Sequence, residues 1–191
     1  MDSSVDAVQF PVPLIGFAAF SGTGKTTLLL KLLPLLKSTG MRIAVVKHAH
    51  HSFDVDYPGK DSYRLRSAGA DEMLVATRCR TALIRECSDG HGEPSLAQTL
   101  AMLDPTRLDL VLVEGFKREP FAKIELHRTA LHSPLLFPGD TNIVAIATDE
   151  GQLAVDPGPL PQLSINRPAE IAAFILEFIG RGERLRPDLA C

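Results

Sequence analysis

A short segment near the amino terminus combines glycines, a lysine and hydroxyl side chains at a spacing that suits phosphate binding. It reads Ala19-Phe20-Ser21-Gly22-Thr23-Gly24-Lys25-Thr26-Thr27. This matches the phosphate-loop (P-loop) pattern G-x-x-x-x-G-K-[ST], except that an alanine replaces the first glycine. Glycines let backbone amides turn inward around phosphate oxygens, and a following helix offers its unsatisfied N–H groups. The pattern therefore predicts a nucleotide phosphate site made by residues 21–27.

Individual side chains of this loop have separate expected roles. Lys25 would reach the β- and γ-phosphates and is a candidate catalytic residue, while the Thr26 hydroxyl would ligate Mg²⁺. Thr27 would lie at the α-phosphate. A glycine turn that carries G-K-T by coincidence is the alternative. The continuous apolar run 14–19 before the loop and the leucine-rich run 25–38 after it favour strand, loop and helix instead.

A second carboxylate-bearing strand is expected in the stretch Asp109-Leu110-Val111-Leu112-Val113-Glu114-Gly115. P-loop proteins place a carboxylate at a strand end beside the magnesium shell. Glu114 stands at the carboxyl end of the apolar run, the edge where open α/β sheets bind ligands, so we expect it to face Mg²⁺. Asp109 lies about 17 Å away by strand rise and cannot serve the same site. An ordinary glutamate at the start of a loop is the alternative.

The segment Lys47-His48-Ala49-His50-His51, followed by Asp54 and Asp56, allows three interpretations. One is a switch-like loop that brings Lys47 and His48 to phosphate and Asp54 or Asp56 to Mg²⁺. Another is a solvated loop. The third is a metal site made by the imidazoles, which is disfavoured because consecutive loop residues rarely converge on one ion.

The residues that would select the base are poorly marked, because the guanine-reading motif N-K-x-D is absent. Asp149 follows the apolar run 143–147, where its carboxylate could accept hydrogen bonds from guanine N1 and N2. An aspartate in a surface turn is an equally open interpretation.

The pattern of apolar runs predicts an α/β fold, with a single P-loop NTPase domain and a mostly parallel central sheet flanked by helices. We expect strands at 14–19, 41–47, 72–77, 81–85, 108–113, 122–127, 143–147 and 163–165. Helices are expected at 25–38, 61–67, 95–103 and 168–179. Residues 1–12 are predicted to be a disordered lead-in, 13–180 the domain and 181–191 a flexible tail.

Composition excludes several classes of partner. The 191 residues carry a formal net charge of −3, which gives no basic footprint for nucleic acid or an anionic membrane. No apolar run is long enough to span a bilayer. The odd count of three cysteines argues against a disulfide framework, and no secretory signal is visible at the start of the chain, so we expect a cytoplasmic protein.

The run 122–127 alternates apolar and charged residues, with Ile124 and Leu126 between Lys123 and Glu125. This alternation predicts a peripheral strand with one solvated face. Such a strand could pair with its copy across a two-fold axis, so we expect a homodimer.

Together, S-G-T-G-K-T-T, K-H-x-H-H, D-x-D-x-P-G-K-D-S and L-V-E-G-F resemble the molybdopterin-guanine dinucleotide biosynthesis protein B (MobB) family, in the same order from residue 14 to about 149. The resemblance implies a dimeric protein that binds GTP with Mg²⁺ and has weak GTPase activity. It also implies an adapter role beside the guanylyltransferase that attaches GMP to molybdopterin. Phosphate would be bound by Gly22, Gly24, Lys25, Thr26 and Thr27, with Glu114 facing the metal.

Two other functions remain open from the residues. One is a P-loop small-molecule kinase or an ATP-dependent ligase of the dethiobiotin synthetase type, which phosphate transfer to a panel of metabolites would reveal. The other is a metal-insertion GTPase that uses His48, His50 and His51, which stoichiometric zinc or nickel in untagged protein would reveal.

Overall fold

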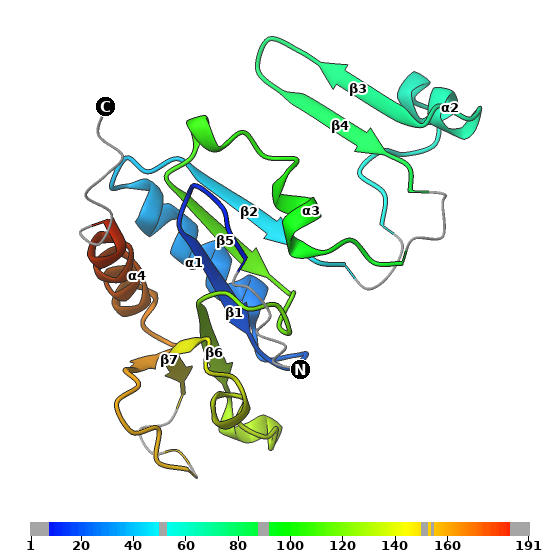
Figure 1. Cartoon of the computed structure of the whole chain (residues 1–191). Coiled ribbons are helices and arrows are strands. Elements are labelled where there is room, and N and C mark those ends of the chain that lie inside the picture. Colours follow the sequence, from blue (N-terminus) through cyan, green and yellow to red (C-terminus); the bar gives the residue numbers. More distant parts are fainter. Residues whose placement is uncertain (1–7, 50–52, 88–91, 150–152, 154, 184–191) are drawn as a thin grey trace, which may run out of the picture. The chain divides into compact units, whose positions relative to one another are not determined.

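A computed structural model describes residues 8–49, 53–87, 92–149, 153 and 155–183. The chain divides into two compact units, which are described separately: residues 1–48 with 95–191 form the first unit, and residues 49–94 form the second unit. Figure 1 traces both along the sequence. Within the described residues, no helix is both long and apolar enough to cross a membrane.

The first unit is built on a sheet of six parallel strands in the order β2-β5-β1-β6-β7-β8. The strands are β1 (Leu14–Ala18), β2 (Ile43–Lys47), β5 (Leu110–Glu114), β6 (Lys123–His127), β7 (Ile143–Thr148) and β8 (Gln162–Ser164). The helices are α1 (Lys25–Lys37), α3 (Leu96–Leu100) and α4 (Pro168–Glu183), with 3₁₀ turns η1 (Pro105–Arg107), η2 (Thr129–Leu131) and η3 (Phe137–Gly139). The predicted fold class is confirmed.

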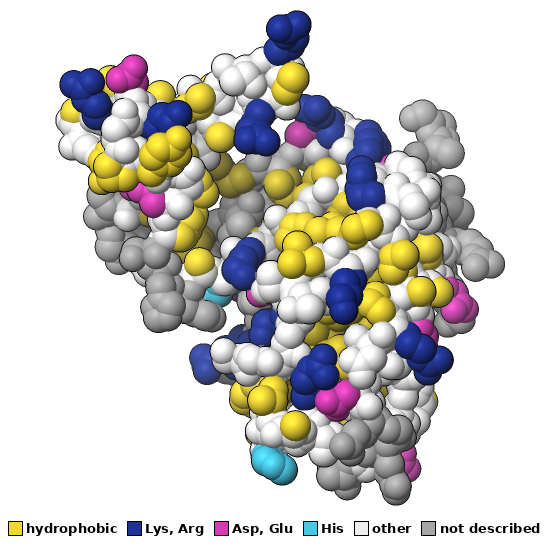
Figure 2. Space-filling view, turned by 180° about the vertical axis from the view of Figure 1, so that it is seen from behind, with side chains coloured by type: hydrophobic (Ala, Val, Ile, Leu, Met, Phe, Trp, Pro, Cys, Tyr) yellow, Lys and Arg dark blue, Asp and Glu magenta, His cyan; other side chains and the backbone are white. Residues whose placement is uncertain are grey.

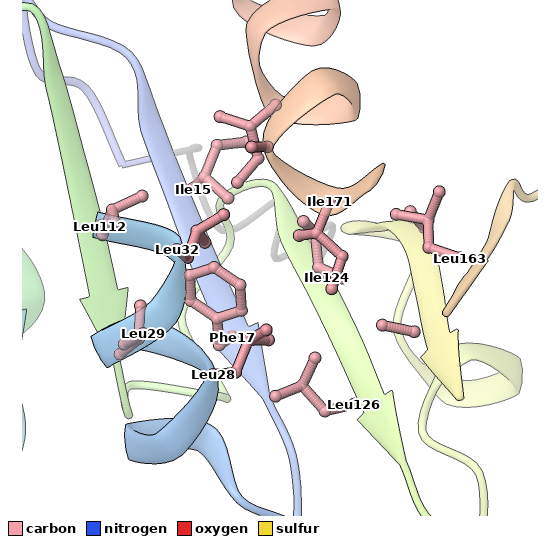
Figure 3. Packing of buried hydrophobic residues seen from close by; sticks show 14 of the residues in the cluster. Ile15, Phe17, Leu28, Leu29, Leu32, Leu112, Ile124, Leu126, Leu163 and Ile171 are labelled. Carbon is pink, nitrogen blue, oxygen red and sulfur yellow. The ribbon is translucent and has the colours of Figure 1, made fainter. Parts of the chain in front are cut away.

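Apolar side chains pack on both faces of this sheet, because β1 and β5 are apolar along nearly their whole length. On one face Leu110 and Leu112 of β5 join a core with α1 and α4, part of which Figure 3 shows. On the other face Val111 and Val113 pack with Leu96 and other residues around α3. Since successive side chains of a strand point to opposite faces, β5 is held from both sides and its two ends are fixed in place.

The chain leads from β1 to β2 on one side of the sheet and later from β5 to β6 on the other side of β1, so the strand order reverses at β1. Open α/β sheets bind ligands at such a switch point, outside the carboxyl ends of the strands. The P-loop, the end of β5 and the end of β6 therefore meet at one edge.

The prediction that the segment 122–127 is a peripheral strand with a solvated face is wrong. Strand β6 pairs with β1 on one side and β7 on the other, and Lys123 and Glu125 are each 1% exposed. The Lys123 Nζ forms an ion pair with Asp140 at 2.7 Å and donates to two backbone carbonyl oxygens. The Glu125 carboxylate accepts the amides of Leu136 and Phe137, at 2.7 and 2.8 Å. Loops cover this face and satisfy its charges, and alternation alone cannot distinguish such a face from a solvated one.

Burial raises the pKa of the Glu125 carboxyl, and the two amide hydrogen bonds oppose that shift.

Residues 8–12, which were expected within a disordered lead-in, pack on the rest of the first unit. The Val8 amide donates to the Pro120 carbonyl oxygen, and Val12 is buried. Residues 1–7 and 184–191 lie outside the described residues, and the predicted domain boundaries stay predictions.

The second unit contains α2 (Asp61–Ser67) and an antiparallel hairpin of β3 (Glu72–Ala76) and β4 (Thr81–Arg85). None of its described helix residues is buried. Its organising side chain is Arg66, which bonds to Asp54 at 2.8 Å, lies 3.9 Å from Asp56 and also pairs with Glu86. This unit is held by ion pairs more than by an apolar core.

Candidate functional site

The P-loop follows β1 directly and turns into α1, as the sequence predicts. Gly22 and Gly24 have φ angles of 80° and 96°, which is the left-handed region that glycine adopts without a side-chain penalty. Between them the Thr23 side chain is buried, and its hydroxyl donates to the Phe20 carbonyl oxygen at 2.8 Å. The loop is thus fixed by its own contacts, while Ser21, Thr26 and Thr27 are exposed.

Lys25 lies folded over this loop. Its Nζ donates to the carbonyl oxygens of Ala19 at 3.1 Å and Phe20 at 3.0 Å. Burial lowers the pKa of Lys25. The negative charge of Glu114 opposes this shift, and the positive charges of Lys117 and Lys47 add to it. The ammonium group therefore lies among several charged groups of the predicted phosphate site.

Glu114 joins the loop to two neighbouring strands. The Thr26 hydroxyl donates to its Oε1 at 3.2 Å, and the Lys47 Nζ donates to the same oxygen at 3.0 Å. The register explains the second contact, because Lys47 of β2 pairs with Glu114 of β5. With only 8% of its surface exposed, Glu114 is a mostly buried carboxylate placed beside the loop.

The next residues along these two strands also touch. His48 stacks on Phe116 with ring centroids 4.5 Å apart, and its backbone amide donates to the Glu114 carbonyl oxygen. The structure thus brings Lys25, Thr26, Lys47, His48 and Glu114 together. The described contact of Lys47 is with Glu114, and its predicted place at phosphate stays a prediction.

Asp54 belongs to the second unit, where it accepts hydrogen bonds from Arg66 and the Asp56 amide. Its predicted part in magnesium binding stays a prediction. His50 and His51 lie outside the described residues. Among the residues that the structure describes, no cluster of three or more histidine, cysteine or acidic side chains could hold a metal ion.

Asp149 lies directly after β7, and its carboxylate has two contacts. Oδ1 accepts the Thr129 amide and Oδ2 accepts Arg128 Nη1, both at 3.2 Å. Asp149 also lines an open pocket of about 400 Å³ with Thr148, Gln162, Ser164, Arg167 and Glu170. Small-ligand pockets begin at roughly 300 Å³, so this one is large enough for a base.

Two cationic side chains near the P-loop were not among the site residues predicted from the sequence. The Arg128 Nε donates to the Thr23 carbonyl oxygen at 2.9 Å, and the Lys117 Nζ lies 5.3 Å from the Phe20 ring centroid. Each comes just after a strand, β6 and β5 respectively, so the rule that ligands bind at strand carboxyl ends could have indicated both.

This arrangement can be compared with known proteins. A family model described as MobB: Molybdopterin guanine dinucleotide synthesis protein B matches residues 14–149, which span β1 to Asp149. The chain belongs to the MobB family. The resemblance stated from the motifs is therefore confirmed.

Two curated relatives match the sequence of this chain over most of their length. The chain is 46% identical over 169 residues to the molybdopterin-guanine dinucleotide biosynthesis adapter protein of Escherichia coli, covering 88% of this chain and 94% of the relative. It is 44% identical over 165 residues to the protein of the same name in Haemophilus influenzae, covering 86% of this chain and 88% of the relative.

Solved structures show the same architecture. The crystal structure of a molybdopterin-guanine biosynthesis protein B (mobB) aligns with a TM-score of 0.64 at 26% identity, covering 86% of this chain and 99% of that chain. The structure of Bacillus subtilis MobB aligns with a TM-score of 0.67 at 23% identity, covering 86% and 96% of the two chains, and supports the fold alone.

Proposed function

We propose that this MobB-family protein binds Mg-GTP at its P-loop and acts as an adapter beside the guanylyltransferase that attaches GMP to molybdopterin. The observation that carries the proposal is the meeting of Lys25, Thr26 and Glu114 at the end of β1, where Thr26 donates to Glu114 at 3.2 Å. The names of the Escherichia coli and Haemophilus influenzae relatives support the adapter role.

The residues at this point fit a magnesium ion. Mg²⁺ prefers oxygen ligands and is usually held by one or two carboxylates together with substrate phosphates and water. The Thr26 hydroxyl and the Glu114 carboxylate supply two such oxygens side by side. They would hold the ion, which would supply positive charge to the β- and γ-phosphate oxygens. Lys25 would bind those phosphates directly, and Lys47 would balance the charge of Glu114.

Under this proposal the base occupies the pocket beside Asp149. Guanine presents donors at N1 and N2, which a carboxylate accepts, whereas adenine presents an acceptor at N1 and no amino group at C2. Each Asp149 oxygen accepts one described hydrogen bond, and a carboxylate has about four acceptor positions. The group can therefore accept further hydrogen bonds from a base. This supports GTP over ATP.

Calorimetry with Mg-GTP and Mg-ATP tests the nucleotide preference. Wild-type protein should bind GTP more tightly, and Asp149→Asn should weaken GTP binding while leaving ATP binding unchanged. Asp156→Asn, at an exposed aspartate, is the matched control. Equal affinity of the wild type for GTP and ATP would refute the guanine preference.

The adapter role is tested with purified guanylyltransferase. Co-elution of the two proteins on gel filtration should depend on whether GTP is present. If no complex forms in either condition, the adapter role is rejected.

We expect the isolated protein to turn over GTP slowly, at about 10⁻⁴ to 10⁻² per second, since P-loop GTPases without an added cation at the γ-phosphate run at such rates. The guanidinium of Arg128 is bonded to the Thr23 carbonyl oxygen and to Asp149, so we do not expect it to supply the cation at the γ-phosphate. Steady-state kinetics at saturating Mg-GTP measures the rate. A value above about one per second, within the range of ordinary kinases, would make the protein an autonomous enzyme.

We also propose that the protein is a homodimer, with contacts made by the second unit instead of β6. A two-stranded hairpin is marginal by itself, and this one carries exposed apolar side chains, which Figure 2 shows at the surface of that unit. Leu74 and Leu83 pair directly across the two strands and are 62% and 43% exposed.

Sedimentation at micromolar concentration should therefore show a dimer for the wild type and a monomer for Leu74→Lys combined with Leu83→Lys. Leu30→Lys, at an exposed leucine of α1, is the control that should stay dimeric. A wild-type monomer with and without GTP would reject the dimer.

A further inference from the structure

Arg128 connects two parts of the first unit that the proposed function treats as separate. It follows β6, and its guanidinium donates from Nε to the Thr23 carbonyl oxygen at 2.9 Å. From Nη1 it donates to Asp149 Oδ2 at 3.2 Å. Asp149 is further held by the Thr129 amide. One side chain thus links the P-loop to the residue placed beside the pocket.

The contact with Thr23 bears on phosphate binding through the geometry of the peptide bond. The Thr23 carbonyl and the Gly24 amide belong to one peptide unit, and among the described residues no peptide is cis. In a trans peptide the C=O and N–H point in opposite directions. By holding the Thr23 carbonyl, Arg128 fixes the opposite direction of the Gly24 N–H, and backbone amides of a P-loop are the groups that bind phosphate.

This peptide needs an external restraint because glycine follows it. Gly24 has a φ of 96°, and a Cβ built there would lie 3.9 Å from Arg128 Nε and Nη2, so the guanidinium packs directly over this residue. Glycine has wide conformational freedom, and the peptide before it can rotate at little steric cost. The Arg128 hydrogen bond limits that rotation.

The contact with Asp149 fixes the carboxylate in the same way. Its two oxygens are held by different donors, so the plane of the group is set. Guanidinium is the side chain suited to this task, because its planar fork can donate to two acceptors at once, whereas an ammonium is a single point charge.

We propose that Arg128 is a positioning residue that couples base recognition at Asp149 to phosphate binding by the P-loop. The part that concerns the base rests on the proposed function, and the part that concerns the loop does not. Loss of Arg128 should weaken both ends of the nucleotide site, whereas loss of the Asp149 charge should weaken only the base end.

The first test uses nucleotide-free protein and measures amide hydrogen exchange of the peptide that contains residues 19–27. Arg128→Ala and Arg128→Lys should both speed exchange in this peptide. Arg107→Ala is the matched control, because it removes an exposed guanidinium just before β5, at the amino ends of the strands and away from the P-loop. Unchanged exchange in both Arg128 variants, at a thermal midpoint equal to wild type, would overturn the restraint.

The second test measures binding of Mg-GTP and of inorganic triphosphate with Mg²⁺. Arg128→Ala should weaken both ligands about tenfold or more, on the scale of one lost hydrogen bond to a charged group. Asp149→Asn should weaken GTP alone. In the Asp149→Asn background, Arg128→Ala should cost GTP less than it does in the wild type, because the coupling is already broken.

Additive losses in that double-mutant cycle would overturn the coupling, as would Arg128→Lys binding both ligands like wild type. Failure of the proposed function is seen separately, as a wild type without preference for GTP over ATP. In that case the exchange experiment and the triphosphate titration still decide whether Arg128 positions the P-loop.

Discussion

A carboxylate stands at each end of strand β5, and each is paired with a cation from the segment that forms β2. Asp109, just before the strand, accepts hydrogen bonds from the backbone amide, Nε and Nη2 of Arg42, at 2.7, 3.0 and 2.7 Å. Glu114, at the far end, accepts the Thr26 hydroxyl and the Lys47 ammonium, both on Oε1. Asp109 is partly exposed, whereas Glu114 is nearly buried.

The difference between the two lies in whether a ligand could replace the partners. A guanidinium fork that grips both carboxylate oxygens is a rigid cross-link, which here joins the amino ends of two parallel strands. A hydroxyl and a lysine are groups that bind magnesium and phosphate in nucleotide sites. Charge pairing alone therefore does not identify a functional carboxylate, whereas partners of these types beside a P-loop support the role proposed for Glu114.

Removing one cation near each end of β5, the P-loop Lys25 at one and Arg42 at the other, should give the largest contrast. Lys25→Ala should weaken Mg-GTP binding about 10- to 150-fold, since a charged hydrogen bond contributes roughly 1.5–3 kcal/mol, while the fold persists. Arg42→Ala should leave the affinity unchanged. Calorimetry and thermal unfolding of both variants measure this. Unchanged GTP affinity in a folded Lys25→Ala protein would refute the P-loop assignment.

Neutralising the two carboxylates should give a smaller contrast that appears mainly in turnover. Glu114→Gln keeps the shape but removes the charge beside Mg²⁺, so the rate of GTP hydrolysis should fall more than the affinity for GTP. Asp109→Asn should change neither quantity. Single-turnover hydrolysis and calorimetry on the two variants distinguish these outcomes, and equal losses of rate and affinity in Glu114→Gln would contradict the role in the metal shell.

The smallest effect concerns pH. Hydrogen bonds from the Arg42 side chain lower the pKa of Asp109 from 3.8 to about 2. A carboxyl whose pKa is lower in the folded state stabilises the fold fully above its unfolded pKa and loses that contribution as the pH falls through the folded value. The difference in thermal midpoint between wild type and Asp109→Asn should thus be constant above pH 5 and shrink steadily as the pH falls from 5 to 2. A difference that stays the same at pH 2 would exclude this ion pair as its source.

The P-loop and the strand ending in Glu114 could be predicted because each is a continuous segment whose residue types carry the signal. The role of Arg128 could not, because it depends on β6 lying next to β1, and that neighbour relation is a property of topology. The alternation in β6 led to the opposite placement at the periphery, since buried charges with loop partners look like solvated ones in sequence. Lys47 contacts Glu114, as the register of β2 and β5 explains, and its expected place at phosphate stays a prediction.

The contact between the ends of β2 and β5 has a mechanical consequence. Gly115 has a φ of 103°, and a Cβ there would lie 2.6 Å from the Cβ of His48, so the two backbones touch with no room for a side chain. The stacked rings of His48 and Phe116 extend this contact. His48 is also the last residue of the first unit before the second unit begins at Ala49. The chain therefore leaves the first unit for the second at a residue that is packed against the residues directly after Glu114.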